Sequence, residues 1–367
     1  MSERIPASDP GALTAPDTVG VGTPPPASES SRVEKEAVRD AESSRDGLLL
    51  LRSSMGRNLG LVIALGLLCL VGVLTAGDRF ASLDNMMTIL RLASTIGVVS
   101  IGMTFVITGG GIDLSVGAIV ALSSVWATTL ATQTMAADIH WVLMVFTALA
   151  VGAGCGVVNG VLIAYGRIAP FIATLAMLAA ARGLAEIIAQ RRTQIVTSRD
   201  FIDFFAGSVV GVPVLVIIFA LVAALGWVLL NRTTFGRRTL AVGGNPEAAR
   251  LAGIKVQRQT AYLYILLGAA CGLAAVMLMA RTTTGTSTHG GLYELDAIAA
   301  VVIGGTLLSG GRATIVGTVL GVLIFTTLTN VFTLNNLDTS TQAVAKGVII
   351  VAAVLLQQRV AARRRAP

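Results

Sequence analysis

The chain has 367 residues, of which 54% are hydrophobic and 13% are charged, with a formal net charge of +7. A soluble protein of this length carries roughly a quarter charged residues, so the composition excludes a soluble globular protein and predicts a surface that mostly faces lipid. The three cysteines, Cys69, Cys155 and Cys271, lie in apolar runs and are expected to be packing residues rather than disulfide partners. The two histidines lie in different loops and form no metal-ligand pattern, so a metalloenzyme is not expected.

Residues 1–57 differ in character from the rest of the chain. Six of the ten prolines lie here among Ser, Ala, Asp and Glu. Such a segment buries too little apolar surface to offset the entropy of ordering, and it lacks the early apolar core of a signal peptide. We predict a disordered cytoplasmic tail at 1–57 and a short basic cytoplasmic tail at 359–367.

Between the tails, the sequence predicts an all-α integral membrane domain over 58–358. Leu59 to Gly77 contains no charged residue over 19 positions, which is long enough to cross the hydrocarbon layer. Nine further apolar runs follow at 86–107, 117–134, 141–165, 169–190, 209–230, 259–280, 296–310, 314–332 and 341–357. We therefore predict about ten transmembrane helices, with the short runs at 296–310 and 341–357 tilted or entering only partway.

The distribution of Lys and Arg predicts the orientation, because cytoplasmic loops carry an excess of both. With the amino terminus inside, one cytoplasmic loop carries the largest group of cations: Arg232, Arg237, Arg238, Arg250, Lys255 and Arg258. The loops near 134–140 and 333–340 contain neither Lys nor Arg. One loop does not follow this rule, because Arg191, Arg192 and Arg199 would lie outside. We predict that both termini are cytoplasmic, and the positive charge is a topology signal rather than a nucleic-acid patch.

Two glycine-rich segments interrupt the apolar runs. The first, Thr108 to Gly117, contains Gly109, Gly110 and Gly111 and then Asp113 and Ser115, which suit the start of the next helix. The second, Ile303 to Arg312, contains Gly304 and Gly305. Irregular backbone at membrane depth needs a protein or water environment. Glycine breaks in both halves therefore favour an inverted-repeat transporter core, the alternative being two ordinary cytoplasmic turns.

Small residues four apart predict close packing between helices. They occur at Gly152, Gly156 and Gly160, at Gly268 and Gly272, and at Gly317 and Gly321. This pattern supports a packed bundle and carries no information about substrate.

The long cytoplasmic loop predicts a short exposed helix. Asn245 is a natural N-cap and Pro246 a natural first helical residue, and Glu247 can pair with Arg250. Gly253 is a natural stop. The segment that could dock into a groove on a partner comprises Asn245, Pro246, Glu247, Ala248, Ala249, Arg250, Leu251 and Gly253. The alternative is a helix that lies on the membrane surface.

Several of these segments resemble one family. Ile107 to Leu122, Asn159 to Arg182, Gly243 to Ile254 and Tyr293 to Gly317 are similar to the signature stretches of the ribose/xylose/arabinose-type permeases of bacterial ABC importers, within the branched-chain-type superfamily. The resemblance runs from about residue 60 to 357. The chain departs from the pattern by one extra glycine in 109–111 and by its longer amino-terminal tail.

The resemblance implies a permease subunit that translocates a monosaccharide across the inner membrane. It implies as partners a cytoplasmic ABC ATPase, an extracytoplasmic sugar-binding protein and a second permease copy or a paralogue. The helix at 245–253 would be the coupling helix for the ATPase. The only lysines are Lys35, Lys255 and Lys346, and none follows a glycine, so the chain has no P-loop. ATP and Mg are therefore expected on the partner, with no cofactor in this chain.

Polar residues within or beside the apolar runs are candidates for the translocation path. We expect Gly110, Gly111, Asp113, Ser115, Gly304 and Gly305 to shape it at the breaks. Asn159, Thr174 and Asn330 could hydrogen-bond a sugar. Asp296 is expected at the outer mouth, and Lys346 could pair with an acid or cap a helix end. Arg182 and Glu186, four residues apart, could neutralise each other.

Other functions stay open from the sequence alone. A related ABC permease for branched-chain amino acids or nucleosides would share this architecture. An ion-coupled secondary carrier would have nothing to dock on the exposed helix, and a membrane scaffold would not need broken helices. The sequence shows no nucleophile with an adjacent base, so an enzyme is not expected.

Overall fold

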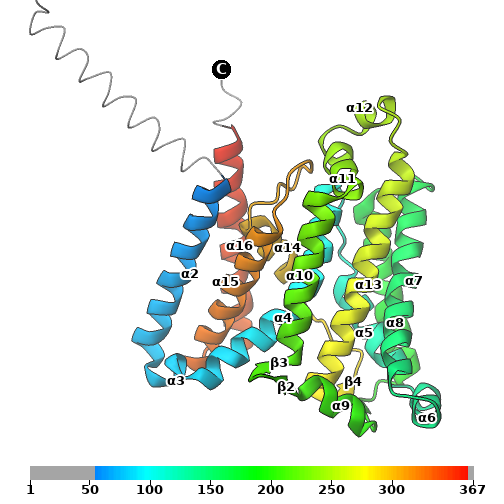
Figure 1. Ribbon diagram of the computed structural model, residues 1–367, viewed down its shortest axis with the longest axis vertical. Coiled ribbons are helices and arrows are strands. Elements are labelled where there is room, and N and C mark those ends of the chain that lie inside the picture. The colour runs from blue at the N-terminus through cyan, green and yellow to red at the C-terminus, as the bar shows by residue number, and fades with distance from the viewer. Residues whose placement is uncertain (1–53, 363–367) are drawn as a thin grey trace, which may run out of the picture. The chain divides into compact units, whose positions relative to one another are not determined.

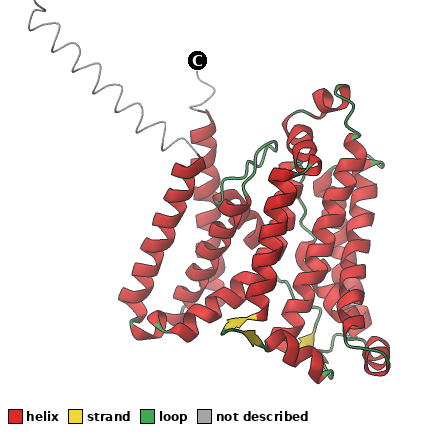
Figure 2. Ribbon diagram, in the orientation of Figure 1, coloured by secondary structure: helices red, strands yellow, loops and turns green. Residues whose placement is uncertain are grey.

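The computed structural model describes residues 54–362. Residues 1–53 and 363–367 lie outside the described residues, so the two predicted tails stay predictions for most of their length. The described chain is almost entirely helical (Figure 2). Its helices are α2 (Ser54–Ala76), α3 (Asp78–Ala81), α4 (Leu83–Thr108), α5 (Val116–Ala127), α6 (Leu130–Asp138), α7 (Val142–Ala164), α8 (Pro170–Ala189), α9 (Arg199–Ala206), α10 (Val214–Arg232), α11 (Thr234–Gly244), α12 (Pro246–Leu251), α13 (Val256–Thr282), α14 (Tyr293–Ile303), α15 (Ile315–Leu334) and α16 (Thr339–Ala362).

Four two-residue strands form two small antiparallel pairs. The strands are β1 (Gln194–Ile195), β2 (Ser208–Val209), β3 (Val212–Pro213) and β4 (Thr284–Gly285). β1 pairs with β4, and β2 pairs with β3. The start of α2, the end of α16 and helices α11 and α12 lie at one end of the bundle, which we call the α12 end (Figure 1). The strands lie at the opposite end, the strand end.

The class of fold is the predicted one, an all-α membrane protein, but the count of ten spans is not confirmed. Among the described residues, seven helices are long and apolar enough to cross a membrane, namely the main parts of α2, α4, α7, α8, α10, α13 and α15. The run 117–134 is a bent pair, because α5 and α6 meet at 55°. The run 296–310 is helical only where it overlaps α14, whose 11 residues (Tyr293–Ile303) rise about 16 Å against about 30 Å of hydrocarbon.

Helices α4 and α13 are the buried centre of the bundle, whereas α2, α8 and α10 expose most of their side chains. On one side of the bundle, α13 packs against α5 and α7, and α8 packs against α5. On the other side, α4 packs against α14 and α15. There α2 contacts α15, and α16 contacts α14. This exposure pattern is what lipid requires, since apolar surface on the outer helices faces hydrocarbon instead of water.

The predicted small-residue packing is confirmed at α7 and α13. A side chain at Gly152 would strike the backbone of Gly268 and Gly272, and one at Gly156 would strike that of Tyr264. The backbones of the two helices therefore touch, which only glycine permits at these positions. Gly317 and Gly321 of α15 lie in the same way against α14.

Candidate functional site

The first glycine break holds a buried polar cluster. Asp113, which is 1% exposed, accepts hydrogen bonds from the Ser115 backbone N–H (2.7 Å), from the Ser115 hydroxyl (2.5 Å) and from Asn159 Nδ2 of α7 (3.2 Å). Asn159 also donates to the Ser115 hydroxyl at 3.0 Å. Three of the residues predicted for the path are thus brought together, and they join the start of α5 to α7.

The predicted capping of α5 is wrong for Ser115, and Asp113 accepts the backbone N–H of Ser115 rather than one within α5. Ser115 occupies the N-cap position, but its hydroxyl turns to Asp113 and caps no backbone N–H of α5. The carboxylate is the stronger acceptor and lies two residues earlier, so it takes both the hydroxyl and the Ser115 N–H. The preceding Gly110 has φ +86°, a left-handed conformation that glycine adopts without strain. Gly111 lies against the phenol of Tyr264.

The second break also contains a glycine with positive φ between two helices, but here the N-cap residue does cap the following helix. α14 ends at Ile303, Gly305 has φ +89°, and α15 begins after Thr314, whose hydroxyl accepts the Gly317 N–H at 3.2 Å. Gly304 lies on the backbone of Gly317 so closely that a side chain would strike it. Both predicted breaks therefore exist.

The two breaks meet each other and the end of α11. The Gly311 N–H donates to the Thr108 carbonyl at 2.9 Å, and a Cβ on Gly310 would lie 3.1 Å from the backbone of Gly110. A Cβ on Gly243, in the last turn of α11, would strike the Thr108 carbonyl and lie 2.7 Å from the Gly311 nitrogen. We call these five residues the glycine junction. The sequence predicted the breaks but gave no signal that α11 lies between them.

The exposed loop helix is α12, and its predicted construction is confirmed. Asn245 Oδ1 accepts the backbone N–H groups of Glu247 and Ala248 at 3.0 Å each, and Glu247 forms an ion pair with Arg250. The hydrogen bond and the charge of Arg250 hold the pKa of Glu247 below its usual value. Pro246 is the first helical residue, Gly253 has φ +81°, and Leu251 is 89% exposed.

The structure adds α11, which sequence reasoning missed. Thr233 caps it by accepting the Gly236 N–H at 3.3 Å, and Asn245 both ends α11 and begins α12. A threonine before a polar, helix-forming stretch was the available signal. Because the two helices share Asn245, Gly243 lies only two residues from the cap of α12.

Asp296 and Lys346 form a half-buried ion pair near the strand end. Lys346 Nζ of α16 donates to both carboxylate oxygens of Asp296 of α14, at 3.0 and 3.1 Å. Their side chains are 19% and 22% exposed. The prediction that Lys346 pairs with an acid is confirmed. The pair lines a cavity of about 200 Å³ between α4, α13, α14, α15 and α16, which sequence reasoning missed.

Two further residues predicted for the path, Thr174 and Asn330, are hydrogen-bonded within the protein. The buried Thr174 hydroxyl donates to the Pro170 carbonyl of its own helix at 2.8 Å. Asn330 and Asn85 exchange two amide hydrogen bonds of 2.7 and 3.1 Å, which tie α15 to α4. The predicted path residues therefore occupy separate places: the two breaks, the Asp296–Lys346 pair, the interior of α8 at Thr174, and the contact of Asn330 with α4.

The expected mutual neutralisation of Arg182 and Glu186 is wrong. Arg182 donates to the carbonyls of Ser287 and His289, and Glu186 lies 3.7 Å from Arg191. The loop after β4 folds over α8 and offers carbonyls that sequence spacing could not reveal. In that loop His289 is hydrogen-bonded to Ser124 at 3.1 Å. Burial, with Arg281 and Arg182 nearby, lowers the pKa of His289 to about 4.

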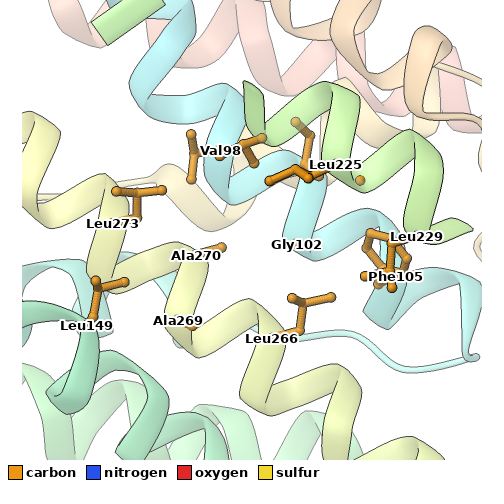
Figure 3. A pocket seen from close by; sticks show the side chains of 13 residues that line it. Val98, Gly102, Phe105, Leu149, Leu225, Leu229, Leu266, Ala269, Ala270 and Leu273 are labelled. Carbon is orange, nitrogen blue, oxygen red and sulfur yellow. The ribbon is translucent and has the colours of Figure 1, made fainter. Parts of the chain in front are cut away.

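A second cavity, of about 250 Å³, lies between α4, α7, α10 and α13. Figure 3 shows its lining of aliphatic and aromatic side chains, among them Val98, Leu225 and Leu273. Each hydroxyl buried there without a partner would cost about 1–3 kcal/mol. This apolar cavity is therefore unsuited to a polyhydroxy substrate, in contrast to the polar cavity beside Asp296.

Comparison with known proteins decides the family. A family model described as the permease component of a branched-chain amino acid transport system matches residues 85–354. The chain belongs to this family of ABC importer permeases. Among its relatives, the ribose import permease protein of Bacillus subtilis (strain 168) is 43% identical over 316 residues, covering 86% of this chain and 94% of that protein. The L-arabinose ABC transporter permease protein of Azospirillum brasilense is 40% identical, covering 80% and 85%.

A third relative, the D-allose transport system permease protein of Escherichia coli (strain K12), is 36% identical, covering 77% of this chain and 85% of that protein. No solved structure matches the chain. The breaks, α12 and the polar cavity of this ABC permease all lie within residues 85–354, which the family model matches.

Proposed function

We propose that this permease is the membrane-spanning subunit of an ATP-driven importer that carries a monosaccharide across the inner membrane. The observation that carries the proposal is the set of relatives named for ribose, L-arabinose and D-allose, at 36% to 43% identity. The second candidate substrate class is the branched-chain amino acids, which the description of the family model favours.

The α12 end is the cytoplasmic end in this proposal. It carries Arg237, Arg238 and Arg250 on α11 and α12, as the preference of cytoplasmic loops for cations requires. A separate ATPase, holding ATP and Mg, docks on α12, where Leu251, Ala248 and Ala252 present a small exposed apolar face. The sugar-binding protein docks at the strand end, and a second copy or a paralogue completes the importer.

The glycine junction transmits movement of α12 to both breaks. A push on α12 reaches Gly243 through the shared residue Asn245. Gly243 lies against Thr108 of one break and Gly311 of the other, and a packed backbone contact transmits displacement because it cannot be compressed. The half-length helices α5 and α14 then move together. This geometry favours a coupled importer over an ion-driven carrier.

The test is hydrolysis of ATP that depends on a loaded binding protein. The permease is reconstituted in liposomes with its ATPase and binding protein, and D-ribose, L-arabinose, D-allose and leucine are compared. We expect one monosaccharide to stimulate hydrolysis and uptake, and Glu247→Ala to reduce the stimulation. Stimulation by leucine alone would transfer the proposal to amino acids. Uptake driven by an ion gradient without any ATPase would refute it.

A further inference from the structure

The cavity beside the Asp296–Lys346 pair combines an ion pair with hydroxyl groups and apolar walls. It lies near the strand end, between α4, the end of α13, the start of α14, α15 and α16. Leu92, Ile96, Val322 and Phe325 supply apolar walls. Its polar groups come from four helices and are Arg281, Tyr293, Asp296, Thr326, Thr329 and Lys346.

The polar groups retain hydrogen-bonding capacity toward the cavity. Among the described residues, Asp296 is the only side chain that hydrogen-bonds to Lys346, which leaves the ammonium a third N–H. The Thr326 and Thr329 hydroxyls donate to carbonyls of their own helix at 2.6 and 2.9 Å, so their oxygens still accept. The cavity therefore offers both donors and acceptors beside apolar walls.

The size and the charge balance fit one small neutral polyol. A volume of about 200 Å³ equals six or seven water molecules of about 30 Å³ each and is below the roughly 300 Å³ at which pockets for drug-sized ligands begin. Asp296 and Lys346 neutralise each other, and Arg281 is exposed at the rim. A hydroxyl can accept from Lys346 while it donates to Asp296, whereas a carboxylate group only accepts and an ammonium group only donates.

We propose that this cavity is a monosaccharide subsite of the permease itself, in which the Asp296–Lys346 pair binds sugar hydroxyls and Thr326 accepts from another. The proposal rests on the proposed function, since it takes the transported sugar as ligand. The sugar would contact α14, which leads directly into the second break, and α16, which packs mainly against α14. Binding of the sugar would therefore be coupled to movement of α14 and α16.

The simpler role for the pair is to fasten α16 to α14, and the experiment separates the two roles. Thr329→Cys places a thiol in the cavity. Thr333→Cys, one turn further along α15 and exposed, is the matched control, and the chain with its native cysteines gives the background. Each is labelled in liposomes with a methanethiosulfonate reagent, with and without the sugar that the wild-type importer transports.

We expect the sugar to slow labelling of Thr329→Cys and to leave Thr333→Cys unchanged. By mass action, sugar at ten times its dissociation constant leaves about a tenth of the sites free and slows labelling about tenfold. In the Thr329→Cys background, the exchanged pair Asp296→Lys with Lys346→Asp keeps an ion pair but moves its donors and acceptors. We expect this chain to keep the parent's melting temperature and to lose protection by sugar.

Three outcomes would overturn the subsite. One is unchanged labelling of Thr329→Cys in an importer that transports the same sugar. Another is equal protection by sodium acetate, which would indicate an anion site. The third is full protection in the exchanged pair, which would indicate a helix tie alone. If the wild-type importer transports no monosaccharide at all, the proposed function fails first, and uptake measured on the same liposomes shows this separately.

Discussion

Gly243 and Gly244 are neighbours in the last turn of α11, and a methyl group meets different surroundings at each. At Gly243 it would strike the Thr108 carbonyl and come within 2.7 Å of the Gly311 nitrogen. At Gly244 the nearest atom, the Gly311 Cα, is 4.0 Å away, which is an ordinary contact. Gly244→Ala is thus a matched control for Gly243→Ala.

The difference between the two variants isolates the contact at the glycine junction. Each substitution gains about 0.5–1 kcal/mol because alanine is the better helix former. Only Gly243→Ala pays for overpacking, typically about 1–3 kcal/mol. Since the helix gain is common to both, we expect Gly243→Ala to be less stable than Gly244→Ala by about 1–3 kcal/mol.

The assay combines unfolding with function. Unfolding of the purified permease in detergent gives the stability difference, and hydrolysis stimulated by the loaded binding protein gives the coupling. We expect Gly244→Ala to match wild type in both, and Gly243→Ala to lose most of the stimulation while the ATPase still binds. Equal stability and equal stimulation in the two variants would refute the transmission of movement through this junction.

Three further expectations follow from local contacts. Gly152→Val should destabilise the α7–α13 contact by about 1–3 kcal/mol. Gly154→Val should not, because nothing lies within 4 Å of that position. Thermal unfolding of the two variants measures the difference. Asn245→Ala removes the acceptor for two N–H groups of α12 and should cost about 1 kcal/mol, seen as weaker ATPase binding that Asn245→Ser partly restores. Burial lowers the pKa of His289 from 6.5 to about 4, so its side chain is neutral in the folded chain at neutral pH. The free energy of unfolding falls as the pH drops from 6.5 toward 4, because the unfolded chain binds the proton first. We therefore expect it to fall less steeply with pH in His289→Gln.

The sequence predicted best where a structure depends on neighbours along the chain. The cap at Asn245, the stop at Gly253 and the pairing of Glu247 with Arg250 all lie within nine residues, and all three are confirmed. Small-residue spacing in α7 predicted the contact with a second helix for the same reason, since periodicity alone places Gly152 and Gly156 on one face.

Prediction failed where partners are chosen by the packing of distant segments. Arg182 and Glu186 are correctly spaced for a pair, yet a loop a hundred residues later offers Arg182 two carbonyls. Likewise, Asn330 exchanges hydrogen bonds with Asn85 of α4, a partner that spacing along one helix could not predict. Spacing states which groups can meet on one helix, and it does not state which competing partner another helix will bring.

The breaks give a physical reason why an apolar run need not be a full span. An apolar run is counted as a span because a helix that ended inside the membrane would leave backbone groups unsatisfied. Here the Thr108 carbonyl at the end of α4 receives the N–H of Gly311 from the other break, and Gly310 lies on Gly110. Each break thus helps to satisfy the other. A half-length helix such as α14 is tolerated because the break that follows it packs against the first break. The two breaks therefore form one structural unit.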